Sequence, residues 1–312
     1  MKPKTIAYLQ LGLLALAVAL FLWWTYPSSA PQIEQTTDTA TSTGPAVPPA
    51  FLNLNLEAKS AYVYDAATNK ALFQYNEELQ WPLASLTKVM TALTASTLLP
   101  EYALVRISPD DLRVEGDSGL HPDEEWSIKN LTDFSLMVSS NDGAQALASA
   151  AGGRVAAEAG KTPVELFVER MNTLAKEIGL HETYFLNPSG LDVSATLSGG
   201  YGSAKDMATL LEYVLEKSPH LLEATSFDRL EVSSKLVQHK AVNTNKVIDT
   251  IPSVLASKTG FTDLSGGNLV VAFDAGINHP IIISLLGSTY DGRFDDMYKL
   301  VQASLEYLAQ AK

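Results

Sequence analysis

The chain has 312 residues, no cysteine and a formal net charge of −13 at pH 7. An acidic surface repels the phosphates of nucleic acids, so we expect no nucleic-acid partner. Without cysteine there is no disulfide framework, and a conventional hydrophobic core has to hold the fold together.

The N-terminal residues predict a membrane anchor. Residues 6–24 are apolar except for Gln10, and about 19 residues at 1.5 Å each span roughly 28 Å, close to the hydrocarbon thickness of a bilayer. Lys2 and Lys4 precede this run, whereas no lysine or arginine follows it until Lys59. This asymmetry keeps the N-terminus in the cytoplasm and places the rest of the chain outside.

The alternative for this segment is a cleaved signal peptide, with Ser28-Ser-Ala30 as the cleavage site. The apolar run is longer than a usual signal core, and Pro31 would hinder the protease, so we expect a retained anchor. The predicted order is a cytoplasmic N-terminus (1–4), a signal anchor (5–26), a disordered Pro/Ser/Thr linker (27–50) and one folded domain (51–312). We therefore expect a single-pass membrane protein with its folded domain outside the cytoplasm, or a secreted protein if the anchor is cleaved.

The folded part predicts an α+β (mixed α/β) domain. Residues 60–65 and 71–75 flank Thr68-Asn69-Lys70 and indicate a β-hairpin. Strands at both ends of this region enclose a helical middle part, which predicts an inserted helical lobe. Helical patterns cover residues 85–98, 163–178, 203–217 and 295–309, and late strands cover 257–260, 268–274 and 280–286.

The first motif, Ser85-Leu-Thr-Lys88, places a hydroxyl and an amine one helical turn apart. Lys88 can therefore reach the Ser85 hydroxyl and take its proton, provided that burial and a nearby cation keep the amine neutral. Read alone, the motif is more commonly a helix N-cap at Ser85 with a surface lysine at Lys88, because such caps are frequent. The apolar surroundings, residues 81–93, instead predict a buried lysine, which needs a reason to be there.

Two further motifs follow, Ser139-Ser-Asn141 and Lys258-Thr-Gly260. Ser139 could relay a proton between Lys88 and a leaving amine, and Asn141 could bind a substrate amide. The third motif would offer a cation and a hydroxyl to a substrate carboxylate, with the glycine leaving room for a peptide at the strand edge. Read alone, the two motifs are a turn between helices and an ordinary strand end.

The histidines show no metal-ligand spacing, so we expect neither a metal site nor a cofactor. They are scattered along the chain at His121, His181, His220, His239 and His279.

The three motifs together are those of penicillin-binding proteins and serine β-lactamases. The chain resembles the low-molecular-mass D-alanyl-D-alanine carboxypeptidases, peptidase family S11, over nearly all of residues 55–310. The segments that carry the resemblance are residues 82–93, 139–148, 167–172, 183–191, 204–208 and 258–263.

The resemblance implies a β-lactamase/D,D-peptidase-like fold, in which helices flank an antiparallel sheet. It implies a serine-type D-Ala-D-Ala carboxypeptidase that trims peptidoglycan stem pentapeptides without a cofactor and is inhibited covalently by β-lactam antibiotics. Carried over by motif, the catalytic residues are Ser85 (acyl nucleophile), Lys88 (general base) and Ser139 (proton relay). The substrate-binding residues are Asn141, Lys258, Thr259, Gly260, Arg293 and Phe261, whose backbone N–H joins that of Ser85 in an oxyanion hole.

Three alternatives remain. The short form of the chain also resembles D,D-endopeptidases of the same family, which cut cross-links. A class A β-lactamase would need a glutamate to activate water, and Glu165 and Glu169 lie in the right part of the chain but on a helical pattern. A non-catalytic receptor for muropeptides or penicillin would share the cleft. The second motif reads Ser-Ser-Asn where Ser-Gly-Asn is usual, a change at a side chain that is not catalytic.

Overall fold

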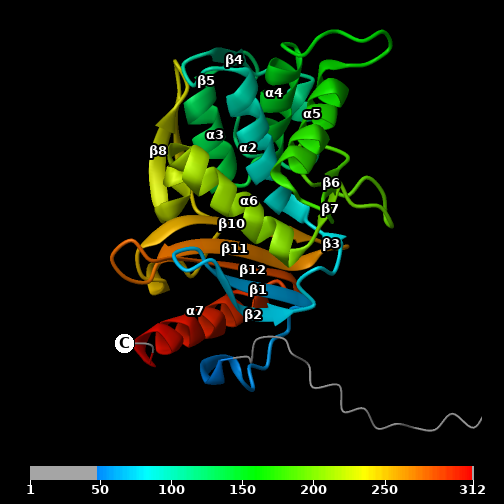
Figure 1. Cartoon of the computed structure of the whole chain (residues 1–312). Coiled ribbons are helices and arrows are strands. Elements are labelled where there is room, and N and C mark those ends of the chain that lie inside the picture. Colours follow the sequence, from blue (N-terminus) through cyan, green and yellow to red (C-terminus); the bar gives the residue numbers. More distant parts are fainter. Residues whose placement is uncertain (1–47, 311–312) are drawn as a thin grey trace, which may run out of the picture. The chain divides into compact units, whose positions relative to one another are not determined.

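The computed structural model describes residues 48–310 (Figure 1). Its centre is a five-stranded antiparallel sheet in the order β10-β11-β12-β1-β2. Strands from the two ends of this region meet inside the sheet, where β1 pairs with β12 and Ser60 lies opposite Leu286. The predicted hairpin and the three late strands are all present, as β1 (Ser60–Asp65), β2 (Lys70–Tyr75), β10 (Val254–Thr262), β11 (Gly266–Asp274) and β12 (Pro280–Ser288).

One face of the sheet is covered by the last helix, α7 (Gly292–Gln310). The helix buries Met297, Leu300 and Val301 in one apolar cluster with the sheet. Asp296 is fully buried at this contact and accepts hydrogen bonds from the backbone N–H groups of residues 57 and 58 and from the Ser288 hydroxyl. The carboxylate thereby ties the start of the domain to its last helix.

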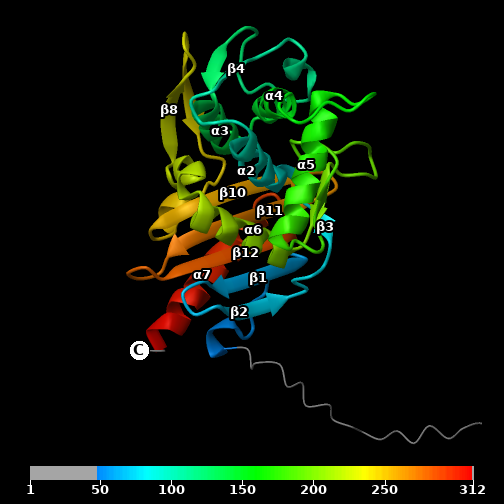
Figure 2. The same cartoon turned by 45° about the horizontal axis from the view of Figure 1, so that its top comes forward.

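The opposite face carries the helical lobe (Figures 1 and 2). Helix α5 begins and ends as the sequence predicts, with a capping box between Thr162 and Glu165, Pro163 at its first position and Gly179 in the left-handed conformation at its end. The mixed α/β class with an inserted helical lobe is therefore correct. The helices of the lobe are α2 (Thr87–Leu98), α3 (Ile128–Met137), α4 (Asn141–Gly152), α5 (Pro163–Ile178) and α6 (Ala204–Lys217).

Several short strands were not predicted from the sequence. They form a three-stranded sheet in the order β3-β7-β6 and two pairs, β4-β5 and β8-β9. Their bounds are β3 (Trp81–Pro82), β4 (Leu104–Arg106), β5 (Glu125–Ser127), β6 (Tyr184–Phe185), β7 (Gly200–Gly202), β8 (Arg229–Ser233) and β9 (Gln238–Val242).

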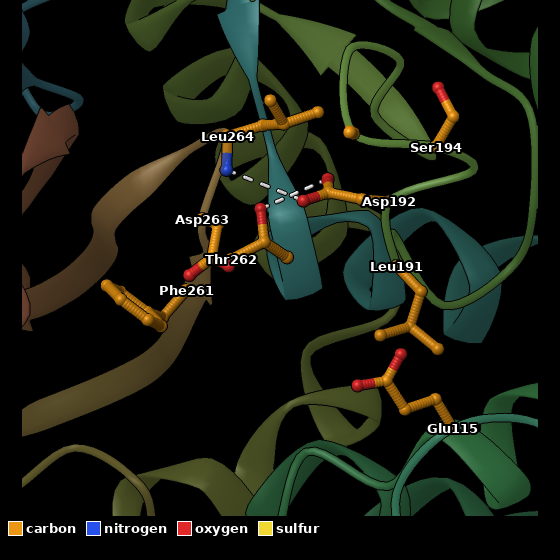
Figure 3. A pocket seen from close by; sticks show the side chains of 9 residues that line it. Glu115, Leu191, Asp192, Ser194, Phe261, Thr262, Asp263 and Leu264 are labelled. Atoms are coloured by element: carbon orange, nitrogen blue, oxygen red, sulfur yellow. Dashed lines mark hydrogen bonds between the residues drawn. The ribbon is translucent and has the colours of Figure 1, made fainter.

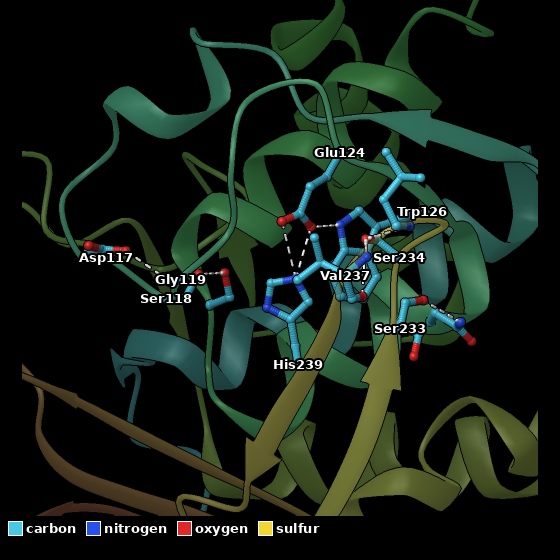
Figure 4. Close-up of polar contacts among 12 residues, drawn as sticks. Asp117, Ser118, Gly119, Glu124, Trp126, Ser233, Ser234, Val237 and His239 are labelled. Atoms are coloured by element: carbon cyan, nitrogen blue, oxygen red, sulfur yellow. Dashed lines mark hydrogen bonds and ion pairs between the residues drawn. The ribbon is translucent and has the colours of Figure 1, made fainter.

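The β8–β9 hairpin stands beside α3 in both views and is fastened to the helical lobe by a buried polar contact (Figure 4). The Nε2 atom of His239 lies 3.0 Å from Oε2 of Glu124, and the Trp126 indole donates to the same oxygen at 2.7 Å. The side chains of His239 and Glu124 are only 9% and 5% exposed. At the tip, the Lys235 ammonium pairs with Glu125 at 2.7 Å. We call the contact between His239 and Glu124 the clasp.

The predicted anchor (5–26) and most of the predicted linker (27–50) lie outside the described residues. Among residues 48–310, no helix combines the length and the apolar character that crossing a membrane requires.

Candidate active site

Ser85 lies in a single 3₁₀ turn, Ala84–Leu86, that leads into α2. The helix was predicted to start at residue 85, and the difference is one tight turn of a kind that is common at helix N-termini. The Ser85 hydroxyl makes no capping hydrogen bond to this turn or to α2, which removes the interpretation of Ser85 as an N-cap. The hydroxyl is therefore free for chemistry.

Lys88 is 1% exposed and points at Ser85. Its Nζ lies 2.7 Å from Ser85 Oγ, 2.8 Å from Asn141 Oδ1 and 2.7 Å from the Ser189 carbonyl oxygen. A neutral amine has two N–H groups and one lone pair. The two carbonyl-type oxygens can take both N–H groups, which leaves the lone pair directed at the serine hydroxyl.

The electrostatics of the site favour that neutral amine. Burial lowers the pKa of Lys88 well below its usual value, and the positive charge of Lys258 lowers it further. Burial also lowers the pKa of Lys258 to about 7, with a contribution from Arg293. Burial lowers the pKa of Arg293 too. Three cationic side chains thus share one poorly solvated region, and the ionisation of each disfavours that of its neighbour.

The second motif is both a turn between helices and part of the site. Ser140 caps α4 by accepting a hydrogen bond from the Gly143 N–H at 2.8 Å. Ser139, at φ +62°, lies between α3 and α4, and its hydroxyl accepts from Lys258 Nζ at 2.9 Å. Ser139 is thus linked to Lys258 and not to Lys88 as the proton-relay prediction implied. Both ends of the Asn141 amide are engaged within the protein, because Nδ2 donates to the Glu115 carbonyl oxygen at 2.8 Å.

The third motif lies on β10, which passes close to the serine. A Cβ atom on Gly260 would come within 2.8 Å of the Leu83 carbonyl oxygen and 3.2 Å of the Ser85 backbone nitrogen, so only glycine allows this approach. Arg293 begins the last helix, is 4% exposed and donates from a terminal nitrogen to the Gly260 carbonyl at 2.7 Å. Its Nε is buried without a hydrogen-bond partner among the described residues.

These side chains surround a cavity of about 460 Å³. The hydroxyl of Thr244, a residue without any sequence signal, lies 2.6 Å from that of Thr259. Ser189 was also missed as a contact of Lys88, although it lies in the segment 183–191 that carries the family resemblance. The predicted residues that line the cavity are Ser85, Ser139, Thr259, Gly260, Phe261 and Arg293, and the others are Val242, Asn243, Thr244, Lys246 and Tyr290.

A second cavity, of about 470 Å³, adjoins the first at Phe261 (Figure 3). Asp192 forms part of its wall and accepts a hydrogen bond from the Thr262 hydroxyl at 3.1 Å. The cavity is lined by Glu115, Leu191, Asp192, Ser194, Ala195, Phe261, Thr262, Asp263 and Leu264. An extended molecule bound along this end of β10 could therefore occupy both cavities.

Glu165 and Glu169, the two candidates for the water-activating glutamate of a β-lactamase, are engaged elsewhere. Glu165 closes the capping box of α5, and Glu169 pairs with Lys161 at 2.7 Å. Neither lines the cavity at Ser85. Within residues 48–310, no group of three or more histidine, aspartate or glutamate side chains could hold a metal ion.

Comparison with known proteins gives a consistent picture. The family model described as D-alanyl-D-alanine carboxypeptidase, peptidase S11, matches residues 43–289. The carboxypeptidase DacF of Bacillus subtilis is 34% identical over 66% of the chain, and the D-alanyl-D-alanine endopeptidase of Escherichia coli is 31% identical over 68% of it. These matches span 51% and 66% of the two relatives, so the chain covers only about half the length of DacF.

A solved structure shares the fold. Penicillin-binding protein D2 of Listeria monocytogenes, determined in its ampicillin-bound form, superposes with a TM-score of 0.68 at 27% identity. The superposition covers 80% of this chain and 98% of that protein. Since the family model matches well over half of the sequence, the chain belongs to the peptidase S11 family of D-alanyl-D-alanine carboxypeptidases.

Proposed function

We propose that this protein is a serine-type D-Ala-D-Ala carboxypeptidase that removes the terminal D-alanine from peptidoglycan stem pentapeptides. The observation that carries the proposal is the buried Lys88 amine, 2.7 Å from the Ser85 hydroxyl, with its pKa lowered by burial and by Lys258. A neutral lysine in this position is a general base for a serine nucleophile. The reaction needs no cofactor.

In the first half-reaction, Ser85 Oγ attacks the carbonyl carbon of the penultimate D-alanine while Lys88 takes the hydroxyl proton. The backbone N–H groups of Ser85 and Phe261 stabilise the oxyanion. The peptide C–N bond then breaks, Lys88 gives the proton to the leaving amine, and the free D-alanine departs. An ester between the shortened peptide and Ser85 remains.

In the second half-reaction, water attacks the ester and gives up a proton to Lys88, so that the shortened peptide leaves with a new carboxyl group and Ser85 regains its hydrogen. Thr259 and Arg293 hold the terminal carboxylate before cleavage, because they supply a hydroxyl donor and positive charge at one end of the first cavity. Lys258 is buried and does not line this cavity, but its charge adds to the attraction. Asn141 orients Lys88 through its Oδ1 atom. The rest of the stem peptide lies past Phe261, in the second cavity.

The test is D-alanine release from a pentapeptide that ends in D-Ala-D-Ala, measured with residues 48–312 and with a Ser85→Ala control. Release by the wild-type domain and its loss in the control are the expected results. A wild-type domain that releases no D-alanine would refute the carboxypeptidase activity.

The same mechanism predicts that β-lactam antibiotics acylate Ser85. We expect penicillin to add its own mass to the protein, as measured by intact-mass spectrometry, and the adduct to be absent from the Ser85→Ala variant. A folded protein that gains no mass would contradict the assignment of Ser85 as nucleophile.

A second candidate function is D,D-endopeptidase cleavage of cross-links, which is favoured by the similarity to an Escherichia coli protein named D-alanyl-D-alanine endopeptidase. A cavity of about 460 Å³ on the carboxylate side has room for more than one D-alanine. Cleavage of a cross-linked dimeric muropeptide faster than of the pentapeptide would favour this function.

We also propose that residues 5–26 anchor the protein in the bacterial cell membrane, with the domain outside. The apolar run and the lysines before it support the proposal. Membrane fractionation of the full chain and of a chain without residues 1–26 tests it, and the full chain in the soluble fraction would refute it.

A further inference from the structure

Thr244 places a second hydroxyl in the part of the cavity proposed to hold the substrate carboxylate. Its Oγ1 lies 2.6 Å from Thr259 Oγ1, and both residues line the cavity together with Ser85. Two hydroxyl groups carry two protons, and the bond between them uses one. Whichever group donates, the pair keeps one proton for an acceptor in the cavity.

The backbone around Thr244 is fixed from two sides. Its N–H donates to the Met137 carbonyl oxygen at 3.2 Å, just before the second motif. The Asn243 side chain donates to the carbonyl oxygens of Thr225 and Phe227, both at 3.0 Å. Thr244 is therefore positioned relative to Ser139 as well as to β10.

The strand that leads to Thr244 is β9, and its other end is held by the clasp. His239 packs against the rings of Trp126 and Phe134, with centroid distances of 4.9 and 5.4 Å. The clasp is almost fully buried, so loss of His239 leaves the Glu124 carboxylate with only its hydrogen bond from the Trp126 indole. The clasp (Figure 4) holds β9 to the helical lobe near its first residue. The bond from Thr244 to Met137 holds the chain to the lobe just after its last residue.

We propose that Thr244 is a further substrate-positioning residue, which shares with Thr259 the recognition of the terminal carboxylate, and that the clasp holds it in place through β9. The inference rests on the proposed function. Thr244 is then expected to determine selectivity for a substrate with a terminal carboxylate, without taking part in the bond-breaking steps at Ser85.

The test compares two pentapeptides that differ only in their C-terminus, one with a free carboxylate and one with a carboxamide. In Thr244→Val, which removes the hydroxyl at nearly constant volume, we expect kcat/KM for the carboxylate peptide to fall roughly 5- to 10-fold, mainly through KM. The value for the carboxamide peptide should change less than about 2-fold. Thr244→Ser restores the hydroxyl and should restore the preference. An equal loss on both peptides, or no loss on either, would overturn the role of Thr244.

For the clasp, His239→Leu removes the donor and His239→Gln keeps a nitrogen at a similar reach. We expect the leucine variant to lose carboxylate preference in the same sense as Thr244→Val, and the glutamine variant to retain it. His121→Leu is the matched control, because the His121 ring lies 6.4 Å from that of His239 but takes no part in the clasp. Wild-type preference in a folded His239→Leu variant, or the same loss in the His121 control, would overturn the role of the clasp.

The rate of acylation by penicillin separates failure of this inference from failure of the proposed function. Penicillin also carries a carboxylate, so Thr244→Val should slow its acylation even if the natural substrate is a cross-link. A wild-type protein that neither releases D-alanine nor reacts with penicillin would overturn both proposals. A reactive wild type with unchanged selectivity in Thr244→Val would overturn only the inference.

Discussion

The pKa of Lys258 makes substrate binding depend on pH near neutrality. Lys258 loses its charge as the pH rises through about 7, whereas the C-terminal carboxylate of a peptide is charged throughout this range. The attraction between them is therefore present below pH 7 and lost above it. With a pKa of about 7, the charged fraction falls from about 90% at pH 6 to about 10% at pH 8. We expect kcat/KM for the carboxylate peptide to fall about tenfold for each pH unit above the midpoint, because kcat/KM reports the free enzyme.

The assay is kcat/KM for D-alanine release between pH 6 and 9. A bound carboxylate favours the charged lysine, so the corresponding fall in kcat should lie at higher pH. The carboxamide peptide provides the control, because it offers Lys258 no negative charge, and its kcat/KM should lack the alkaline fall. A carboxylate profile that stays flat to pH 9, or a parallel fall with both peptides, would refute the reasoning.

Three further predictions concern packing and buried charge. Gly260→Ala should lower kcat/KM about 100-fold, because the added methyl group pushes β10 away from Ser85. Gly276→Ala is the control and should have no effect, since its Cβ would meet only His279 Cβ at 3.8 Å. Equal values of kcat/KM in the two variants would contradict this prediction. Asp296→Asn should lower the free energy of unfolding by about 1–3 kcal/mol. It should not change D-alanine release at 25 °C, because Asp296 lines neither cavity. An unchanged midpoint of unfolding in urea would count against this prediction. Lys258→Met should be more stable than the wild type at pH 6 by about 1 kcal/mol, and should therefore unfold at a higher temperature, because it removes a buried charge. The difference should shrink as the pH rises from about 7, where the folded wild type loses this charge, toward 10.5, where the unfolded wild type loses it too. A lower melting temperature for the variant at pH 6 would contradict this prediction.

The elements that the sequence predicted well are those with local signals. Helix α5 has Thr162, Pro163 and Gly179 at its ends and one apolar face, so its bounds follow from the chain alone. The β8–β9 hairpin lacks such signals, because its strands are mostly polar and bury little beyond Val232 and Ala241. It exists because the helical lobe supplies Glu124 and an apolar surface, which no local pattern can reveal.

The candidate site likewise contains residues that a local sequence pattern reveals and residues that only the folded structure reveals. Its three motifs could be found from the sequence, because their lysine, serine and glycine residues occur at fixed spacings and act through their own side chains or, for glycine, the lack of one. Ser189 contributes a backbone carbonyl to Lys88, and any residue type can supply one. No sequence pattern distinguishes Thr244 from the other threonines, and only the fold places its hydroxyl beside that of Thr259. The link between Ser139 and Lys258 likewise depends on how closely β10 approaches the turn between α3 and α4.

The pairing of β1 with β12 has a consequence for how the chain folds as it is made. Asp65 and its partner Ile281 are separated by 216 residues (281 − 65), which take roughly 10–40 s to synthesise at typical rates of translation. Until then the β1–β2 hairpin has no third strand, and an isolated two-stranded hairpin is only marginally stable in water. The central sheet therefore closes only after nearly the whole domain has emerged. In the meantime the apolar strand Ser60–Asp65 is open to pairing with other chains, so a domain truncated before β12 should aggregate where the full domain folds.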